Sequence, residues 1–446
     1  MKEYDLVVLG TGGAGYRVAM KSAQAGWKVA AIDRGPFGGT CSIHGCIPKK
    51  ILAGMAEIAD TNRRLHDIGI VEDMPKMNWS ELIKFKRTFT DPVEKGTIQS
   101  LKAAGIDVFK GSPRFTGDRE LEVDGQQLKA KNVHIATGLE PAKLPIEGFE
   151  HLIDNKAFLE MDILPKRVLF VGAGYVSFEF AHVAARFGAA VTILHTNEHP
   201  LPMFDQDIVN TLLNASKDIG IAVELNAAVQ KVEKQGDVFI VTTSDSRTFE
   251  ADVVVHGAGR VPAIADMNLE ATGVEYDKRH GIIVNEFLQS VSNPQVYAAG
   301  DVAAAGAPLT PLSGLQAAIV ADNLLGKQRK QPSYRSTASV VFTTPAVAKV
   351  GLLEAEAEEK KIEFDTIDTD ISGWFDNRRL VLKHARSKVL VEKGTNKIIG
   401  AHLIGSHAED IVSFFSLAIE TGLTTEQLKA PIFAFPTASD DMRSMF

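Results

Sequence analysis

Apolar and polar residues occur in blocks along the first thirty positions, and the blocks predict a strand, a helix and a second strand. Residues 5–9 form a short apolar run that ends at Gly10. Apolar residues at helical spacing follow to about residue 25, and a second apolar run at residues 28–32 ends at Asp33. Short runs of this kind are typical of parallel strands buried on both faces. The pattern therefore predicts a βαβ unit at the N-terminus.

The loop between the first strand and the helix has the spacing of a dinucleotide-binding turn. Gly10, Gly12 and Gly15 stand in a GxGxxG pattern. Glycine permits a tight turn and the close approach of a pyrophosphate, and the helix N-terminus supplies free N–H groups and partial positive charge. Asp33, at the end of the next strand, can accept hydrogen bonds from a ribose. We predict that this unit binds a dinucleotide.

The same pattern occurs again in the middle of the chain. Residues 167–171 form a strand, and Gly172 and Gly174 begin the loop, with Ser177 at the third glycine position. A helical pattern follows, and then a strand at residues 190–194. A small residue such as serine still permits close packing of the helix on the strand. One such motif is a weak signal, but two in one chain predict two dinucleotides and electron transfer between them.

The pattern outside these units predicts a different domain at the C-terminus. A helix is expected near residues 82–104, followed by strands with a turn at Asp124-Gly125. Beyond residue 331, strands and one helix are expected at residues 339–342, 381–384, 388–392, 398–404 and 410–421. Strands and helices arranged in this way indicate a separate α+β domain.

The composition is that of an ordinary globular protein with a mild acidic excess. A chain of 446 residues is long enough for two or three domains. Its 48 Lys and Arg against 56 Asp and Glu give a net charge of −8, which argues against nucleic acid or an anionic membrane as a partner. The sequence has no apolar run long enough to span a membrane and no secretory signal. We expect a cytoplasmic protein.

The two cysteines, Cys41 and Cys46, lie only five positions apart in an otherwise cysteine-free chain. In a reducing compartment this spacing favours a redox pair over a structural disulfide. In a regular helix the two residues would be separated by about 7.5 Å along the axis, more than the roughly 4.4–6.8 Å of bonded cysteines. The helix that they begin must therefore be distorted there. A zinc site is disfavoured because further ligands at metal spacing are missing, and no metal site is predicted.

The segment Gly38-Gly39-Thr40-Cys41 … Gly45-Cys46-Ile47-Pro48-Lys49-Lys50 closely resembles the class I pyridine nucleotide-disulfide oxidoreductases, such as glutathione reductase, dihydrolipoamide dehydrogenase and mercuric reductase. The resemblance covers nearly the whole chain. It implies an α/β fold with a Rossmann-like FAD-binding domain, an inserted Rossmann-like NAD(P)-binding domain and a C-terminal α+β dimerisation domain that forms a homodimer. The implied domains are 1–150 and 278–333 for FAD, 151–277 for NAD(P)H and 334–446 for dimerisation.

The resemblance also implies roles for individual residues. Cys46 matches the cysteine that faces the flavin and Cys41 the one that attacks the substrate, while Lys50 and Glu179 match an ion pair beside the flavin. The positions that match FAD-binding residues are Gly10, Gly12, Gly15, Asp33, Thr40, Thr137, Gly138 and Asp301. Those that match the nicotinamide nucleotide site are Gly172, Gly174 and Gly259.

These roles imply an enzyme in which hydride passes from NAD(P)H to FAD, and the flavin reduces the Cys41–Cys46 disulfide. The reduced pair would then reduce a small disulfide or a similar soft electron acceptor. The chemistry of the hydride step belongs to the cofactor, and the protein supplies position and electrostatics.

The sequence departs from the resembled family at the C-terminus. Disulfide-reducing members have a His-Pro-x-x-x-Glu motif there, whose histidine serves as an acid–base in the other subunit. This chain has Phe435 at the histidine position and Asp440 at the glutamate position. Phenylalanine cannot transfer a proton, and positioned acid–base catalysis is typically worth about 10²–10⁴-fold. Ordinary glutathione or lipoamide turnover is therefore in question.

Three alternatives follow from this departure. Another group, of which His44 is the nearest titratable candidate, replaces the histidine. Alternatively, the acceptor is a metal ion or a quinone and needs no acid, although the chain lacks the C-terminal cysteine pair on which mercuric reductase relies. The third alternative is a flavoprotein that senses redox state and turns over poorly.

The choice between NADH and NADPH is open as well. NAD-dependent enzymes commonly have an acid at the end of the second strand of the nucleotide unit, and NADP-dependent enzymes have arginines after it. This chain has His195 and Thr196 at these positions. The missing acid slightly favours NADPH, with His195 and His199 as possible partners of its 2′-phosphate.

Overall fold

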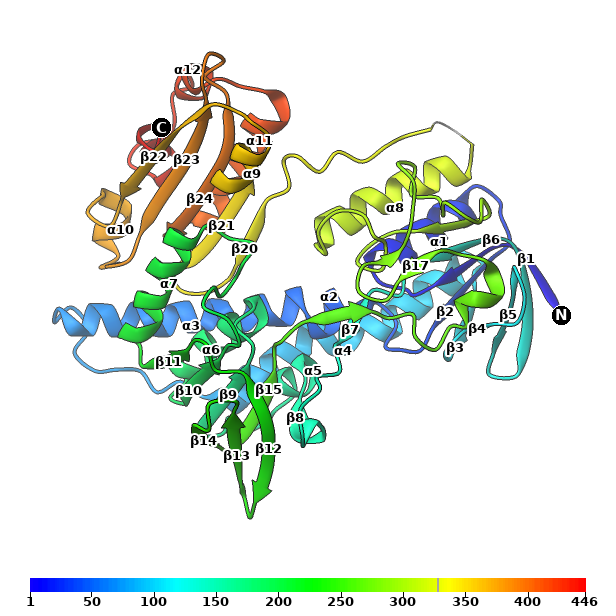
Figure 1. The fold of residues 1–446 in the computed structure, drawn as a ribbon, viewed down its shortest axis with the longest axis horizontal. Coiled ribbons are helices and arrows are strands. Elements are labelled where there is room, and N and C mark those ends of the chain that lie inside the picture. Colours follow the sequence, from blue (N-terminus) through cyan, green and yellow to red (C-terminus); the bar gives the residue numbers. More distant parts are fainter. Residues whose placement is uncertain (327–328) are drawn as a thin grey trace. The chain divides into compact units, whose positions relative to one another are not determined.

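A computed structural model describes residues 1–326 and 329–446 of the chain. The chain divides into two compact units, which are described separately. Unit 1 comprises residues 1–48, 85–142 and 259–334, and unit 2 comprises residues 49–84, 143–258 and 335–446. Each unit contains one of the two predicted βαβ units, and Figure 1 labels elements along the chain. The domain boundaries expected from the sequence stay predictions.

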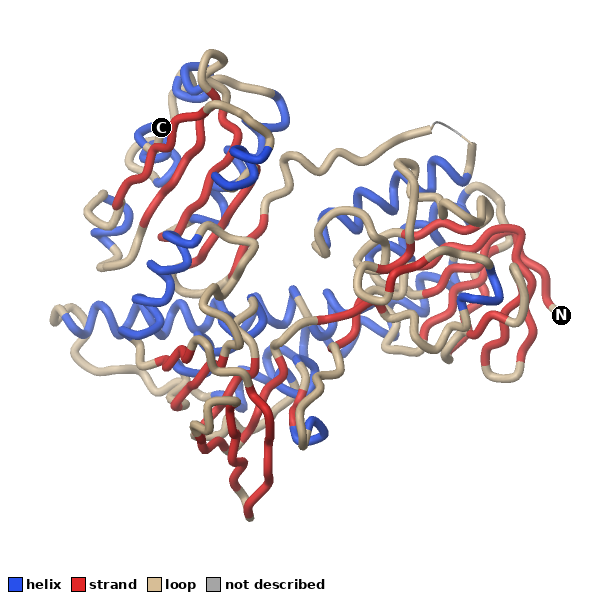
Figure 2. Tube along the Cα trace, in the orientation of Figure 1, coloured by secondary structure: helices blue, strands red, loops and turns tan. Residues whose placement is uncertain are grey.

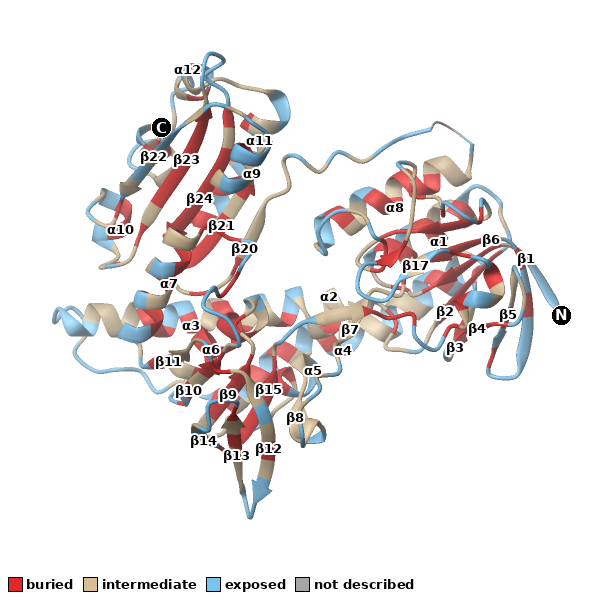
Figure 3. Cartoon of the chain, in the orientation of Figure 1, coloured by how far each residue is buried: buried red, intermediate tan, exposed pale blue. Residues whose placement is uncertain are grey.

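Unit 1 is built around a sheet in the order β3-β2-β1-β6-β5-β4, with β19 paired to β6. The four central pairings, β2–β3, β1–β2, β1–β6 and β6–β19, are parallel. The strands are β1 (Lys2–Leu9), β2 (Val29–Asp33), β3 (Asp107–Lys110), β4 (Arg114–Phe115), β5 (Glu120–Val123), β6 (Gln126–Ile135) and β19 (Val296–Ala298). Apolar side chains of β1, β2 and β6 fill the core, which Figure 3 shows as buried.

The helices of unit 1 follow the loops at the carboxyl ends of these strands. Helix α1 (Gly13–Gln24) follows β1 and packs against α8 (Thr310–Leu324). The short helix α2 (Gly39–His44) follows β2, and α3 (Cys46–Asp67) begins in unit 1 and continues in unit 2. Helix α4 (Trp79–Ala103) also contributes to both units. The remaining strands of unit 1 are β7 (Leu139–Pro141) paired with β16 (Arg260–Pro262), and β17 (Tyr276–Asp277) paired with β18 (Gly281–Ile282).

The first part of unit 2 repeats the nucleotide-binding architecture. Its sheet has the order β11-β10-β9-β15-β8, and all its pairings are parallel. The strands are β8 (Leu152–Ile153), β9 (Arg167–Val171), β10 (Ala190–Leu194), β11 (Ile221–Glu224) and β15 (Val253–His256). The helices are η1 (Phe149–His151), α5 (Asn155–Leu159), α6 (Tyr175–Arg186) and α7 (Gln206–Asp218). An antiparallel ribbon of β12 (Val229–Gln235), β13 (Val238–Thr243) and β14 (Thr248–Ala251) is added to it.

The second part of unit 2 is an antiparallel sheet in the order β20-β21-β24-β23-β22 (Figure 2). Its strands are β20 (Ser339–Val341), β21 (Ala346–Gly351), β22 (Phe364–Asp370), β23 (Arg386–Glu392) and β24 (Ile398–Gly405). Helix α11 (Ala408–Thr421) packs on β21 and β24. The shorter helices are α9 (Glu354–Glu359), α10 (Phe375–Arg379), α12 (Thr425–Lys429), α13 (Ala438–Asp441) and η3 (Met442–Ser444); η2 (Leu269–Thr272) belongs to unit 1.

Most of the predicted elements are present, and the C-terminal α+β domain has the predicted character. The strand predicted at residues 381–384 is wrong: these residues form a turn after α10. Val381 has φ 56°, in the left-handed region, and the N–H of Leu382 bonds to the carbonyl of Asn377 instead of a neighbouring strand. The apolar run at residues 381–384 therefore belongs to the turn that follows α10 and adds no strand to the sheet.

Candidate active site

The first glycine loop of unit 1 is shaped by close backbone packing. Gly10 has φ 97°, and a side chain there would collide with the carbonyl of Ala136 at the end of β6. A side chain at Gly15 would collide with the carbonyl of Gly10. These positions therefore require glycine, and the loop leaves the N-terminus of α1 open for an anion.

A chain of hydrogen bonds connects this loop to the end of β2. Asp33 Oδ2 accepts from the N–H and the hydroxyl of Thr11, both at 2.7 Å, and Oδ1 accepts from Gly35 N at 2.9 Å. The Thr11 hydroxyl in turn accepts from Gly38 N at 3.1 Å. Asp33 thus lies at the predicted place, where its carboxylate orders the loop; its contact with a ribose stays a prediction.

The glycine loop also positions the helix that carries the cysteines. Gly39, with φ 76°, approaches Gly12 so closely that a side chain at residue 39 would collide with the Gly12 Cα atom. Helix α2 therefore begins directly on the dinucleotide loop, and Thr40 and Cys41 follow in its first turn. The two predicted functions, dinucleotide binding and dithiol chemistry, share one piece of backbone.

Cys41 and Cys46 do not lie on one regular helix. Helix α2 ends at His44, Gly45 adopts φ −141° and ψ −116°, and α3 begins at Cys46. This break confirms the predicted distortion, and it brings the two side chains together: the Cys41 and Cys46 thiols are hydrogen-bonded to each other. Both cysteines are in the thiol form in this structure.

Thr310 is the third member of this thiol cluster. Its Oγ1 lies 3.2 Å from Cys46 Sγ and also hydrogen-bonds to Cys41. Thr310 is the first residue of α8, which has Pro311 in its first turn. The N-terminus of a helix carries partial positive charge, so this position favours a sulfur anion.

The environment of Cys41 holds a proton on its sulfur. The hydrogen bond to Cys46 and burial both raise the pKa of the Cys41 thiol well above its ordinary value, and the hydrogen bond from Thr310 partly offsets them. Such a pair shares one proton between two sulfurs when one of them ionises. The proton on Cys41 is therefore held more firmly than on an ordinary cysteine.

Three further residues of unit 1 were expected at the flavin. Thr137, after β6, has a buried hydroxyl with no hydrogen-bond partner among the described residues, and Gly138 follows it with φ 70°. Burial raises the pKa of Asp301, whose carboxylate accepts a hydrogen bond from Ser313 at 3.4 Å. A buried hydroxyl without a partner is costly, which indicates a place for a polar ligand atom.

The second glycine loop, in unit 2, is equally tight. Gly172 has φ 94°, and a side chain there would collide with Ala258. Ser177 is fully buried on α6, and a side chain at Gly257 would collide with its hydroxyl. The small residue at the third position therefore allows the close packing that the sequence predicted. Gly259, with φ 115°, directly precedes β16 in unit 1.

His195 has a structural role at the end of β10. Its Nδ1 lies 3.3 Å from the N–H of Ala173 in the glycine loop and accepts from it, while Nε2 lies 3.2 Å from the carbonyl of His199 and donates to it. Both ring nitrogens of His195 are therefore engaged by backbone groups of the two loops. His199 itself is exposed and lies 3.2 Å from Glu198.

The lysine that pairs with Glu179 is Lys49, not Lys50. In unit 2, Lys49 Nζ lies 2.8 Å from Glu179 Oε1, which also accepts from Phe342 N at 2.9 Å. Glu179 is 1% exposed. Lys50 instead lies 3.5 Å from Glu409 and over the ring of Phe342. The expected Lys50–Glu179 pair is therefore corrected, since residue 49 is on the side of α3 that faces α6.

At the histidine position of the family's C-terminal motif, this chain has the apolar side chain of Phe435. The Phe435 side chain is 83% exposed in the described chain. The N–H of Asp440 donates to the Thr437 hydroxyl at the N-terminus of α13, and the Asp440 carboxylate lies 3.4 Å from Arg443. His44 is the last residue of α2. The described chain therefore has no imidazole at the histidine position of the C-terminal motif.

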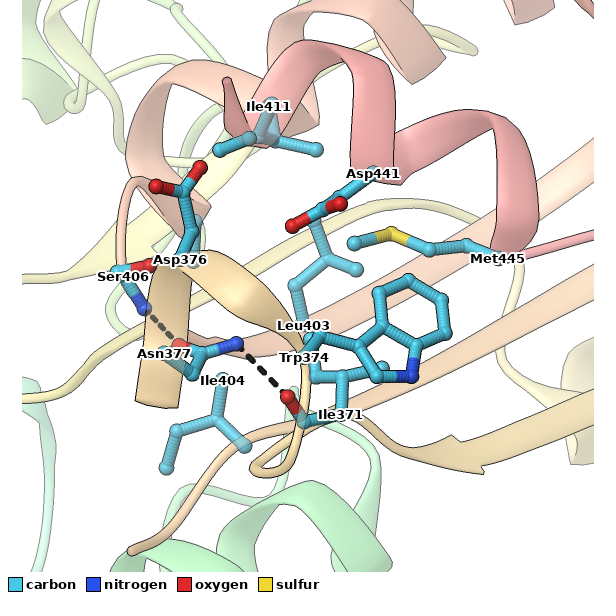
Figure 4. A pocket seen from close by; sticks show the side chains of 13 residues that line it. Ile371, Trp374, Asp376, Asn377, Leu403, Ile404, Ser406, Ile411, Asp441 and Met445 are labelled. Atoms are coloured by element: carbon cyan, nitrogen blue, oxygen red, sulfur yellow. Dashed lines mark hydrogen bonds between the residues drawn. The ribbon is translucent and has the colours of Figure 1, made fainter. Parts of the chain in front are cut away.

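Figure 4 shows a hollow beside this segment in the C-terminal part of unit 2. Asn377 joins its walls, because its amide donates to the Ile371 carbonyl at 3.0 Å and accepts from Ser406 N at 2.9 Å. Asp376 and Asp441 both line the hollow, and burial together with the charge of Asp376 raises the pKa of Asp441. The hollow holds no imidazole or thiol.

Comparison with known proteins decides the family. Residues 4–323 match the family model described as pyridine nucleotide-disulphide oxidoreductase, and residues 337–446 match its dimerisation domain. The chain belongs to the pyridine nucleotide-disulphide oxidoreductase family. Like other members, it is an FAD-dependent oxidoreductase that uses a pyridine nucleotide.

Several relatives of known name are similar over almost the whole chain. A mercuric reductase of Staphylococcus aureus is 30% identical over 99% of this chain and 81% of its own length. A glutathione reductase of Burkholderia cepacia is 29% identical over 98% of this chain and 97% of its own. Among solved structures, a Cu(II) complex of the HOCl-induced flavoprotein disulfide reductase RclA from Escherichia coli has 26% identity and a TM-score of 0.90, covering 100% of this chain and 99% of that chain.

The residues of this oxidoreductase fit an FAD at the first glycine loop. At Gly10 and Gly39 the backbone of neighbouring segments comes so close that no side chain fits. The buried Thr137 hydroxyl lacks a protein partner in the described chain. FAD would supply two-electron transfer between a nicotinamide and the adjacent thiol pair. In the described residues no helix is long and apolar enough to span a membrane, and no group of three or more potential ligands is arranged for a metal ion.

The contribution of Thr310 to the thiol cluster was not predicted from the sequence. The signal that could have indicated it is the Thr310-Pro311 start of a helix soon after the Gly300-Asp301 strand end. Proline in a first helical turn marks the helix N-terminus. That signal places a helix end but does not show that it lies against Cys41 and Cys46, because the contact joins residues 264 positions apart.

Proposed function

We propose that this flavoprotein uses NAD(P)H to reduce a small disulfide or a similar soft acceptor through Cys41 and Cys46. The observation that carries the proposal is the cluster of both thiols with Thr310, directly beside the glycine loop. Two thiols in hydrogen-bond contact can close a disulfide without movement of the chain backbone over long distances. A dithiol beside a dinucleotide loop is suited to pass an electron pair from coenzyme to an external acceptor.

The disulfide reaction would proceed through two exchanges. The Cys41 sulfur, as thiolate, attacks one sulfur of the substrate, so that a mixed disulfide forms and one substrate thiolate leaves. The Cys46 thiolate then attacks the Cys41 sulfur, which closes the Cys41–Cys46 disulfide and releases the second substrate thiolate. Two protons from solvent neutralise the two products, and one NAD(P)H supplies the two electrons that reopen the disulfide.

The missing imidazole sets the pH dependence of this reaction. Because its pKa is raised, Cys41 keeps its proton at neutral pH and attacks slowly. We expect disulfide turnover to rise steadily with pH above neutrality. In Phe435→His, an added acid–base is expected to restore about tenfold or more of the activity at neutral pH. A pH profile of Phe435→His identical to that of the natural chain would contradict this account.

A panel of acceptors tests the proposed function. Purified holoenzyme is supplied with NADH or NADPH and with disulfides, quinones and metal ions in turn, and compared with Cys41→Ser and Cys46→Ser. The proposal expects turnover with a disulfide or another soft acceptor that both variants abolish. Turnover that survives Cys41→Ser with every acceptor would show that the thiols are not on the electron path.

A metal ion is the second candidate acceptor. Phe435 removes the acid that a thiol leaving group needs, whereas reduction of a soft metal ion by two thiolates needs no proton donor. The structurally similar RclA was solved as a Cu(II) complex, and one relative is a mercuric reductase. We expect one Hg(II) ion, or two Cu(II) ions, to be reduced for each thiol pair oxidised, with dependence on both cysteines. A quinone acceptor would instead leave activity in Cys41→Ser.

The coenzyme, assembly and location complete the proposal. NADPH is slightly favoured because no acid follows β10. Since both ring nitrogens of His195 are engaged by backbone groups, we expect discrimination between the coenzymes of less than about tenfold. The match of residues 337–446 to the dimerisation domain supports a homodimer. Two closely spaced cysteines support a reducing compartment such as the cytoplasm.

A further inference from the structure

Residues 195–205 form the loop that joins β10 to α7 in unit 2. In a nucleotide-binding βαβ unit, the end of the second strand and the residues after it lie beside the ribose of the coenzyme. This loop is bonded to the glycine loop at two places: Ala173 N donates to His195 Nδ1 at 3.3 Å, and Leu201 N donates to the Ala173 carbonyl at 3.2 Å. The first part of the loop is therefore fixed to the glycine loop.

The loop ends in a short turn that leads into α7. Leu201 is 3% exposed, and its carbonyl accepts from Phe204 N at 2.9 Å. Asp205 is the N-cap of α7, where its Oδ1 accepts from Asp207 N at 3.0 Å and from Ile208 N at 3.2 Å. Because this one turn joins Leu201 to Asp205, a shift of Asp205 would move the residues that contact the glycine loop.

The other carboxylate oxygen of Asp205 is bonded to the C-terminal sheet. Lys388 Nζ, on β23, lies 2.9 Å from Asp205 Oδ2, and the two side chains are only 4% and 7% exposed. Lys388 also lies 2.5 Å from Asp207 and 3.0 Å from Glu354 on α9. Breaking a buried ion pair is costly, because the remaining charge is left without a partner. The coenzyme loop is thus held by the glycine loop at one end and by the C-terminal sheet at the other.

We propose that Lys388 and Asp205 are positioning residues for the coenzyme: their ion pair holds residues 195–205 in the conformation that receives the ribose of NAD(P)H. The inference rests on the proposed binding of the coenzyme at the glycine loop of residues 172–174, and it does not depend on the acceptor that the cysteines reduce. A loop that is ordered before binding saves the cost of ordering it. Without the ion pair, a smaller fraction of molecules has the competent loop, and the Kd rises in inverse proportion.

Asp205→Asn tests the positioning role separately from helix capping. Asparagine is as good an N-cap as aspartate, so α7 keeps its start while Lys388 loses this carboxylate. Calorimetry measures the Kd of the oxidised holoenzyme for NADP⁺ and for NAD⁺, which bind without reducing the flavin. We expect the Kd to rise by about fivefold or more, while kcat at saturating NAD(P)H stays within about twofold.

A rise in Kd of less than about fivefold would overturn the positioning role and leave the coenzyme site intact. Absence of coenzyme binding to the natural enzyme would instead contradict the proposed coenzyme site itself.

Glu354→Gln is the matched control, because it removes a carboxylate from Lys388 without altering the coenzyme loop. We expect its Kd for the coenzyme to stay within about twofold of the natural value. Lys388→Gln should weaken binding as much as Asp205→Asn does, and the double variant should weaken it no further, since both changes break one pair. Equal losses in Glu354→Gln and Asp205→Asn would show that the cluster supports unit 2 as a whole, and the proposal would be abandoned.

Discussion

At the scale of single residues, the chemistry of the thiol pair depends on one hydroxyl as much as on the sulfurs. Thr310 is hydrogen-bonded to both Cys41 and Cys46, whose reactivity otherwise depends on burial and on each other. A hydroxyl cannot replace an imidazole as an acid, but it can hold a thiolate in place and lower its pKa. Thr310 is therefore a positioning residue for the sulfur that carries the charge.

Removal of this hydroxyl should raise the thiolate pKa. In Thr310→Val, the reduced enzyme loses one donor to Cys46, and we expect the pKa of its thiolate to rise by about one unit. The measurement is a pH titration of the long-wavelength absorbance of the reduced flavoprotein. Thr310→Ser keeps the hydroxyl and should titrate as the natural chain does. An unchanged thiolate pKa in Thr310→Val would show that the Thr310 hydroxyl does not stabilise the thiolate.

The two adjacent lysines should differ in importance. Lys49 is the counter-ion of the buried Glu179, while Lys50 pairs at 3.5 Å with the more exposed Glu409. We expect Lys49→Met to slow flavin reduction by NAD(P)H about tenfold or more in stopped-flow measurements, because a buried carboxylate loses its charge partner. Lys50→Met should stay within about threefold. A larger effect of Lys50→Met than of Lys49→Met would instead support the Lys50–Glu179 pair expected from the sequence.

At the scale of elements, the central strands of unit 1 contain a buried titratable group. His134 on β6 is fully buried between Val8 of β1 and Tyr297 of β19, and burial lowers its pKa to about 4. An unfolded histidine titrates near 6.5. Below pH 6.5 the unfolded chain therefore binds a proton that the folded chain does not bind until about pH 4, and stability falls across this window.

We expect the free energy of unfolding of unit 1 to decrease by about 2 kcal/mol from pH 7 to pH 5 through this residue. Hydrogen exchange at the amides of β1 and β6 measures it. In His134→Met, which has no titratable group, the decrease should be smaller by that amount. Equal pH dependence in both proteins would show that the buried ring does not limit stability.

At the scale of the whole molecule, the sequence predicts the architecture better than the site. The glycine loops at Gly10 and Gly172 and the alternation after residue 331 indicate two nucleotide-binding units and an α+β domain, because these features are local. The partner of Glu179 and the role of Thr310 depend on helices that meet only after folding. Residues 381–384 failed as a strand for a different, local reason, since the Asn377 carbonyl accepts from Leu382 N and closes a turn there.

A partly buried ion cluster connects the two parts of unit 2. Lys388 on β23 lies 2.9 Å from Asp205, 2.5 Å from Asp207 and 3.0 Å from Glu354. Burial opposes its charge, but the three carboxylates outweigh this and raise the pKa of Lys388. The cluster connects the start of α7 to the C-terminal sheet.

We expect Lys388→Met to destabilise unit 2 by about 3 kcal/mol, because Asp205 is left buried without its cation. Lys393→Met is the matched control, since its pair with Asp365 is solvent-exposed and should contribute less than about 1 kcal/mol. Urea denaturation followed by circular dichroism compares them. A loss of similar size in both variants would show that the buried cluster contributes no more than a surface pair.

The most direct test of the account is an anaerobic titration of the oxidised holoenzyme with NADPH. If electrons pass through FAD to the Cys41–Cys46 disulfide, full reduction of the natural enzyme takes about two equivalents of coenzyme, and the intermediate stage shows a long-wavelength band. Cys46→Ser should take about one equivalent and show no such band. A natural enzyme whose absorbance stops changing after one equivalent, with the Cys41–Cys46 disulfide still intact, would contradict the account.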